Sequence, residues 1–138
     1  MEIVGIGNDI EEVERFANKL EASAFFEKVY TKRERQYILS KKNPEQTAAG
    51  IFCAKEAFFK AFGSGILFPL VNVEVCHKES GMPYFSFYGT LSEKIKKEEL
   101  AVYLAISHTA RYATANVVIE RRERMNNENC ISVSDETN

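Results

Sequence analysis

The stretch "IFCAKEAFFKAF", residues 51–62, predicts the element around which the rest of the chain folds. It reads as one helix that is apolar on almost every side, and such a helix is normally buried in a core. The same stretch carries Lys55, Glu56 and Lys60. Because charged groups are costly to remove from water unless they are paired or bind an ion, the question is what these side chains face.

This helix is expected to begin before the quoted stretch. Asn43-Pro44-Glu45 combines a capping residue, a proline at the first helical position and an acid in the first turn. Gly63 is the expected residue just past the helix end. The pattern therefore predicts one long helix from about residue 44 to residue 62.

The polar residues of this helix form a narrow stripe. At about 100° per residue, Glu56 and Lys60 project within about 40° of each other, one turn apart. One interpretation is a surface ion pair that faces water, and the other is a carboxylate and an ammonium that face a cleft. Lys55 lies on another side, where we expect it to extend along apolar neighbours.

Helices dominate the predicted first half of the chain. Residues 2–7 are expected to form a short buried strand, and residues 9–20 a helix with Asp9 at its N-cap. Thr31 and Glu34 match a capping box that opens a further helix, to about residue 41.

Strands dominate the second half. Four strands are predicted, over residues 71–78, 84–88, 100–107 and 112–120. Residues 79–83 are expected to be a turn, and residues 90–99 a short helix with a capping box from Thr90 to Glu93. Residues 100–107 are almost wholly apolar and are expected to form a central strand. The sequence predicts an α+β fold, with helices packed on one face of a mainly antiparallel sheet.

The composition is that of one globular domain. The chain has 138 residues, 45% of them hydrophobic and 28% charged, which excludes a disordered protein. We expect a single domain over residues 1–120 and a polar, mobile tail over residues 121–138. The net charge of −2 argues against a general nucleic-acid binder.

The cysteines and the N-terminus predict a cytoplasmic protein. Cys53, Cys76 and Cys130 are an odd number without metal-type spacing, so free thiols in a reducing compartment are the simple interpretation. The N-terminus lacks the basic start of a signal peptide. No apolar run approaches the roughly 20 residues that span a membrane, so no membrane partner is expected.

Asp9 has two interpretations. It can cap a helix, or it can act with Glu56 as a ligand of a hard metal ion. Mg²⁺ is often held by one or two carboxylates together with phosphate oxygens and water. Two acids from distant segments would suit such a site.

Two further segments could bind an anion. "GSG", residues 63–65, is either a helix stop with a turn or a backbone phosphate contact. In "ISHTAR", residues 106–111, no G-x-S-x-G occurs, so a hydrolase nucleophile is not indicated. His108 can donate to a phosphate or be a plain loop histidine, and Arg111 adds a nearby cation. Taken together, the set suits a ligand with Mg²⁺ and phosphate.

The chain resembles a known family at three places: "GIGNDI" at 5–10, "FCAKEAFFKAFGSGI" at 52–66 and "ISHT" at 106–109. These stretches look like the three signatures of holo-[acyl-carrier-protein] synthase, the small single-domain type of 4′-phosphopantetheinyl transferase. The resemblance covers about residues 1–120. It implies transfer of phosphopantetheine from coenzyme A to a serine of apo acyl carrier protein in fatty acid biosynthesis, with release of adenosine 3′,5′-bisphosphate.

The resemblance also implies roles for single residues. Asp9 and Glu56 would hold Mg²⁺ against the diphosphate of coenzyme A, and Lys60 would contact the phosphates. Glu56 or a water on the metal would accept the serine proton. The phosphates and adenosine would be bound by Gly63, Ser64, Gly65, Ser107, His108 and Thr109. Arg15 matches a family arginine near the carrier or nucleotide, and a homotrimer with sites between protomers is implied.

Two departures from the family pattern bear on function. Many members have Arg where this chain has Ile51, so a phosphate contact is missing or supplied elsewhere, for example by Arg111. Three acids, Glu11, Glu12 and Glu14, stand where relatives are often basic, so carrier docking would use other cations. These cations are Arg15, Lys19, Lys28, Lys32, Arg33 and Arg35. Two alternatives stay open: a non-catalytic module that binds coenzyme A or a nucleotide, and a phosphohydrolase with the same Mg²⁺ site.

Overall fold

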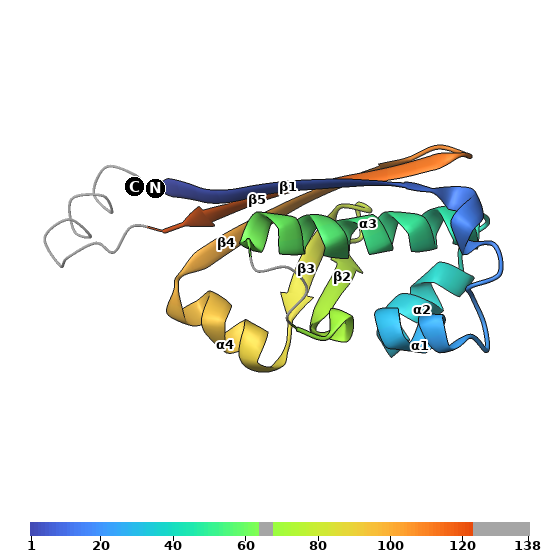
Figure 1. Cartoon of the computed structure of the whole chain (residues 1–138), viewed down its shortest axis with the longest axis horizontal. Helices are drawn as coiled ribbons and strands as arrows, with labels where there is room; N and C mark the ends of the chain where they lie inside the picture. Colours follow the sequence, from blue (N-terminus) through green and yellow to red (C-terminus); the bar gives the residue numbers. More distant parts are fainter. Residues whose placement is uncertain (64–67, 123–138) are drawn as a thin grey trace, which may run out of the picture.

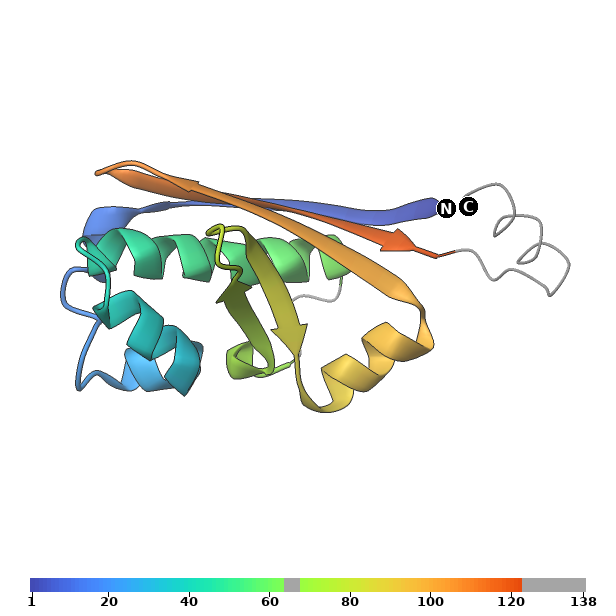
Figure 2. The ribbon, with the colours of Figure 1, turned by 180° about the vertical axis from the view of Figure 1, so that it is seen from behind.

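The computed structural model describes residues 1–63 and 68–122. Its described part has three layers (Figure 1): a three-stranded sheet, the long helix α3 (Pro44–Phe62) lying along that sheet, and a two-stranded hairpin with the smaller helices beyond α3. The reverse view shows the same order, with α3 between the sheet and the other elements (Figure 2). The predicted α+β class with antiparallel sheets is confirmed.

The remaining elements follow the chain as β1 (Glu2–Glu12), the 3₁₀ turn η1 (Val13–Phe16), α1 (Ala24–Val29), α2 (Lys32–Leu39), the 3₁₀ turn η2 (Leu70–Asn72), β2 (Val73–His77), β3 (Pro83–Phe87), α4 (Gly89–Lys97), β4 (Leu100–His108) and β5 (Tyr112–Arg121). The prediction for α3 is confirmed at both ends: Pro44 begins it, and Gly63 ends it in the left-handed conformation at φ 80°. The capping box of Thr31 and Glu34 at the start of α2 is also confirmed.

The large sheet has the strand order β1-β5-β4, and every pair is antiparallel. The central strand is therefore β5, whose side chains alternate, so that Ala113, Ala115, Val117 and Ile119 are all buried beneath α3. The prediction that residues 100–107 form a central strand was wrong, because β4 lies at one edge of this sheet. Its apolar run reflects helix α3 on one face and exposed apolar side chains on the other.

The first strand also differs from its prediction. Residues 9–12 continue β1 by pairing with residues 112–115 of β5, so Asp9 lies within a strand and not at a helix N-cap. The predicted helix over residues 9–20 was wrong because apolar spacing at Ile10, Val13 and Phe16 fits a strand followed by a tight turn equally well. Strand β1 is not buried as expected, since its outer face is exposed.

Smaller corrections concern the second half. Strand β2 buries its first four residues on both faces and does not alternate between buried and exposed. The predicted helix at 90–99 is α4, but Tyr88 is its N-cap residue and makes no capping bond, so the Thr90–Glu93 box was wrong. The helix α1 was not predicted, because its six residues are too few for a clear period.

Lys55 does not extend to solvent. Its side chain and that of Glu34 are fully buried, with Nζ 2.6 Å from Glu34 Oε1. Nζ also donates to the carbonyl oxygens of Val29 and Leu70, and Glu34 Oε2 accepts from the Val75 N–H. The expectation that Lys55 runs along apolar neighbours to water was wrong, because a buried carboxylate on α2 pairs with it. This pair joins α3 to α1, α2 and the hairpin side.

Three further predictions can be placed. Cys53 and Cys76 are buried free thiols, as expected, while Cys130 lies outside the described residues. The tail predicted over residues 121–138 also lies outside them, apart from residues 121 and 122. No helix within residues 1–63 and 68–122 combines the length and the apolar character needed to cross a bilayer.

Candidate active site

Asp9 lies on the face of β1 that packs toward α3. Its Oδ1 accepts a hydrogen bond from Lys60 Nζ at 3.1 Å, and its side chain is only 11% exposed. Its Oδ2 is buried, and no hydrogen-bond donor in residues 1–63 and 68–122 reaches it. A buried carboxylate oxygen without a donor is uncommon, and it suits a position that an ion can fill.

Glycines bring this strand unusually close to the helix. A Cβ added to Gly7 would lie 2.0 Å from the carbonyl oxygen of Ala57, and one added to Gly5 would lie 1.8 Å from that of Ala61. Both distances are shorter than any real contact, so only glycine lets β1 approach α3 here. The motif "GIGND" therefore fixes how far Asp9 stands from Lys60.

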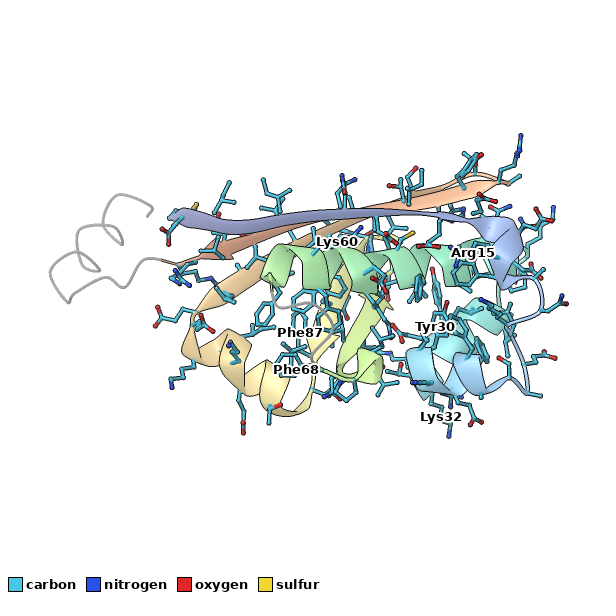
Figure 3. All side chains as sticks on the ribbon, viewed as in Figure 1. Arg15, Tyr30, Lys32, Lys60, Phe68 and Phe87 are labelled. Atoms are coloured by element: carbon cyan, nitrogen blue, oxygen red, sulfur yellow. The ribbon has the colours of Figure 1, made fainter. Side chains whose placement is uncertain are left out.

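Glu56 is half-buried on the same side of α3 (Figure 3 labels Lys60 between α3 and β1, with Phe87 on the other side of the helix). Burial raises the pKa of Glu56, the Asp9 carboxylate raises it further, and the Lys60 ammonium opposes both effects. Two carboxylates that act on each other electrostatically therefore face one region, with Lys60 beside them. The ion pair in this region joins Lys60 to Asp9, and the Lys60 side chain remains about half exposed.

Glu11 is a further acidic residue beside the candidate site, and the sequence alone did not single it out. It stands two residues after Asp9 on the same face of β1 and is paired with Arg15, whose Nη1 lies 2.9 Å from Glu11 Oε1. Burial raises the pKa of Glu11, and the charges of Asp9 and Glu56 raise it further, while Arg15 lowers it. In a strand, residues two apart share a face, so assigning residues 9–12 to a strand would have placed Glu11 beside Asp9.

The charge in this region is arranged for a cation. Among the described residues, no group of three or more His, Cys, Asp or Glu is placed to hold a metal ion, so a site here would rest on a pair of carboxylates. Asp9 and Glu56 are the candidate pair, because Glu11 is engaged with Arg15. Mg²⁺ is commonly bound by one or two carboxylates, with substrate phosphates and water completing its octahedron. The unpaired Oδ2 of Asp9 and the donor set of two carboxylates fit that ion.

His108 lies at the end of β4 beside a separate cavity of about 380 Å³. Its Nδ1 is 3.0 Å from Gln46 Oε1. Gly50 makes room for this strand end, since a Cβ there would lie 2.9 Å from Ile106 Cγ2. Four cations and imidazoles line the cavity: Lys41, Lys42, His77 and His108.

The other predicted site residues do not all meet here. Ser107 is exposed beside His108, and the hydroxyl of Thr109 accepts bonds from the Arg111 and Tyr112 N–H groups in the following turn. Neither Ser107 nor Thr109 is among the residues that line the cavity, although Ile51 is. Ser64 and Gly65 lie outside the described residues.

Arg111 does not take the place of the arginine absent at Ile51. It lies over the Tyr112 ring, 5.8 Å from the ring centroid, and lines a different cavity together with Glu12 and Glu45. The cavity beside Ile51 receives its positive charge from other residues.

The candidate residues thus form two groups on different sides of α3. Glu56 and Lys60 face β1, while Gly50 faces the end of β4. The six residue steps from Gly50 to Glu56 rotate by about 600°, which is one full turn and about 240° more. We refer to the first group, Asp9, Glu56 and Lys60, as the carboxylate site, and to the second as the cationic cavity.

Comparisons with known proteins identify the family of this chain. The profile of the 4′-phosphopantetheinyl transferase superfamily matches residues 5–116. Two holo-[acyl-carrier-protein] synthases are each 40% identical over 124 residues: that of Fusobacterium nucleatum, over 85% of this chain and 98% of its own, and that of Bacillus subtilis, over 86% and 97%.

Solved structures of the same family resemble the chain as well. A holo-(acyl-carrier-protein) synthase of Bacillus anthracis in complex with CoA (3′,5′-ADP) superposes with a TM-score of 0.74 at 34% identity, covering 88% of this chain and 100% of that one. That of Neisseria meningitidis gives a TM-score of 0.78 at 32% identity, covering 86% and 99%. The chain therefore belongs to the holo-[acyl-carrier-protein] synthase family of the 4′-phosphopantetheinyl transferase superfamily.

Proposed function

We propose that this chain transfers the 4′-phosphopantetheine group of coenzyme A to a serine of apo acyl carrier protein, with Mg²⁺ held by Asp9 and Glu56. The observation that carries the proposal is the buried Oδ2 of Asp9, which has no donor among the described residues and stands opposite Glu56 and beside Lys60. Two carboxylates can hold a divalent ion, and the Lys60 ammonium can meet phosphate oxygens beside it. This set suits a diphosphate whose negative charge is partly neutralised by that ion.

The reaction needs stabilisation of negative charge more than it needs covalent chemistry. The serine oxygen forms a bond to the β-phosphorus of coenzyme A, and the bond from that phosphorus to the bridging oxygen breaks. Adenosine 3′,5′-bisphosphate leaves with the negative charge, and the serine proton is lost. When bound, Mg²⁺ would neutralise charge on the diphosphate.

The side chains of this site have separate tasks. Lys60 is 54% exposed, so its ammonium can leave Asp9 and contact phosphate oxygens as charge develops on them. Glu56 is the candidate acceptor for the serine proton, because it stands beside the metal position and accepts a proton more readily than an ordinary carboxylate. Gly7 and Gly5 keep β1 close enough for Asp9 to share this position.

The adenosine end of coenzyme A is proposed to enter a cationic cavity lined by His108. Gly63, Ser64, Gly65, Ser107 and Thr109 stay predicted contacts for the phosphates and adenosine. Because the cavity and the carboxylate site lie on different sides of α3, we propose that one ligand bridges the carboxylate site of one protomer and the cavity of another. A homotrimer would supply such pairs by rotation.

The outer face of the large sheet supports this assembly. The side chains opposite α3 include Ile6, which is 70% exposed, Ile10, which is 66% exposed, and Tyr103 on the edge strand β4. Exposed apolar patches on soluble proteins commonly mark contacts with other chains. The proposed occupant is the same face of a second copy.

Acyl carrier protein is the proposed macromolecular partner. Several cations around α1 and α2 are exposed and suit an acidic partner: Lys19, Lys28, Lys32 and Arg33. The other two predicted docking cations, Arg15 and Arg35, have partners within the chain. Arg15 pairs with Glu11, and Arg35 donates to the Tyr30 carbonyl oxygen. The free thiols at Cys53 and Cys76 agree with a cytoplasmic location.

The test is a mass measurement on the carrier. Purified chain, an apo acyl carrier protein, coenzyme A and Mg²⁺ are expected to give a carrier that is heavier by one phosphopantetheine group, and chelation of the metal should stop the reaction. Tight binding of coenzyme A without any mass gain on several apo carriers would instead favour the non-catalytic module. Cleavage of coenzyme A with no carrier present would favour a phosphohydrolase.

A further inference from the structure

The cationic cavity is built to hold an anion. Lys41, Lys42, His77 and His108 line it, and none of the lining residues that the structure describes is acidic. The neighbouring cavity of about 290 Å³ has the opposite character, with Glu12, Glu14 and Glu45 around Arg111. Positive groups gathered around one open space repel each other, and a bound phosphate would offset that repulsion with its negative charge.

His77 has an unusual setting within this cavity. Its imidazole stacks on the Tyr37 ring with 4.0 Å between centroids and 7° between planes. Lys41 Nζ lies 4.5 Å from the same Tyr37 centroid. The Tyr37 ring therefore holds the imidazole in one orientation at the end of β2, and the ammonium group is close enough to act on it.

Burial lowers the pKa of His77, and the Lys41 charge lowers it further. We therefore expect the imidazole of the free protein to be mainly neutral at pH 7.5, which lies above its ordinary pKa of about 6.5. The charged or titratable groups that face it are Lys41, Tyr37 from α2, and Lys42 and His108 across the cavity. An anion among these groups would favour the protonated imidazole.

We propose that His77 determines specificity for the 3′-phosphate of coenzyme A, taking up a proton as that phosphate enters the cationic cavity. The diphosphate is assigned to the carboxylate site on another side of α3, so the remaining phosphate of the molecule, a monoester on the ribose, is the anion left for the cavity. Ile51 is 2% exposed and brings no charge to the cavity wall, so the lysines and histidines are the groups that can meet the phosphate. Among them, His77 is held in one orientation by the Tyr37 ring. This inference rests on the proposed function.

Calorimetry with coenzyme A and with dephospho-coenzyme A, which lacks the 3′-phosphate, tests the proposal. In His77→Gln the affinity for coenzyme A is expected to fall roughly 10- to 100-fold, the effect of one charge-assisted hydrogen bond, while affinity for dephospho-coenzyme A stays unchanged. Titrations at pH 7.5 in buffers of different ionisation enthalpy should show proton uptake by the original chain that is smaller in His77→Gln. Lys78→Gln, an exposed cation one residue away on the hairpin, should change neither quantity.

The imidazole can also be followed directly. NMR titration of His77 should give a pKa below 6.5 in the free protein and a higher one with adenosine 3′,5′-bisphosphate. The proposal would be overturned if His77→Gln preferred coenzyme A over dephospho-coenzyme A as strongly as the original chain does. It would also be overturned if the His77 titration did not change when the ligand binds. The proposed function fails separately, if the original chain transfers no phosphopantetheine at all.

Discussion

Lys55 Nζ lies 2.6 Å from Glu34 Oε1, and both side chains are fully removed from solvent. Nζ also donates to two backbone carbonyl oxygens, and Glu34 accepts from the N–H groups of Thr31 and Val75. Every group around the pair is therefore bonded, which is the condition under which a buried ion pair is tolerated. The lysine of the "KEA" stretch is a structural anchor on a different side of α3 from the carboxylate site.

Removing one member of this pair should be costly. Lys55→Met keeps the length of the side chain but leaves the Glu34 carboxylate buried without its cation, so the free energy of unfolding should fall by about 3–5 kcal/mol. Urea denaturation measures this change. The control is Lys96→Met on the exposed face of α4, expected to change stability by less than about 0.5 kcal/mol. A loss below 1 kcal/mol for Lys55→Met would contradict the role as an anchor.

The close packing of β1 on α3 makes a second prediction. Gly7→Ala places a methyl group 2.0 Å from the Ala57 carbonyl oxygen, so the strand must move away and carry Asp9 with it. We expect a loss of about 1–3 kcal/mol in stability, the usual cost of overpacking, together with a lower transfer rate. Circular dichroism melting and the carrier assay measure the two effects. Asn8→Ala, on the outer face, lacks this clash, and an equal effect of the two changes would argue against it.

The hairpin side should respond to acid. Burial alone would raise the pKa of Glu74, but hydrogen bonds from Thr31 (2.6 Å) and Tyr88 (2.7 Å) outweigh it, so the folded pKa is lowered. A lowered folded pKa gives stability that is present above the unfolded value, about 4.3, and is lost as pH falls through the folded value.

Glu74→Gln should therefore cost about 1–3 kcal/mol at pH 7 and less at pH 3, where Glu74 of the original chain is also becoming protonated. Urea unfolding over pH 3–7 gives both values. The exposed Glu79→Gln serves as the control, with no expected pH-dependent difference. If the difference in unfolding free energy between Glu74→Gln and the original chain grew toward pH 3, the prediction would be contradicted.

The sequence was sufficient for α3 because its signals are local. Asn43-Pro44-Glu45 and Gly63 define its ends, and the spacing of Glu56 and Lys60 follows from helix geometry. The end of β1 could not be predicted in the same way. Its residues 9–12 are held by pairing with β5, about a hundred residues later, and a local apolar period carries no information about that partner.

The candidate site, like the fold, could be predicted only in part from the sequence. Asp9, Glu56 and Lys60 were singled out by residue type, and the structure brings them together. Glu11 and His77 were not, because Glu11 joins Asp9 only in a strand and His77 meets Tyr37 only when β2 packs beside α2. Lys55 could not be paired from sequence, since Glu34 lies 21 residues earlier on another helix.

The carboxylate site makes a prediction that does not depend on turnover alone. Asp9→Asn removes the charge of the buried oxygen, so binding of Mn²⁺ as a paramagnetic substitute for Mg²⁺ should weaken by more than about tenfold in the presence of coenzyme A. Electron paramagnetic resonance measures the free ion, and the transfer rate should fall by more than about 100-fold. Glu12→Gln, on the opposite face of β1, should keep both values, and unchanged Mn²⁺ binding in Asp9→Asn would reject the metal assignment.

The proposed sharing of each site between protomers can be tested by complementation. Asp9→Asn disables the carboxylate site, and His108→Ala disables the cationic cavity, so each variant alone should be nearly inactive. If one ligand bridges two protomers, co-expressed variants that assemble at random should recover roughly a quarter of the original rate, because each required half is intact in half of the subunits. A pair from the same group, Asp9→Asn with Glu56→Gln, should recover nothing. The same absence of recovery with Asp9→Asn and His108→Ala would place both groups of a working site within one chain.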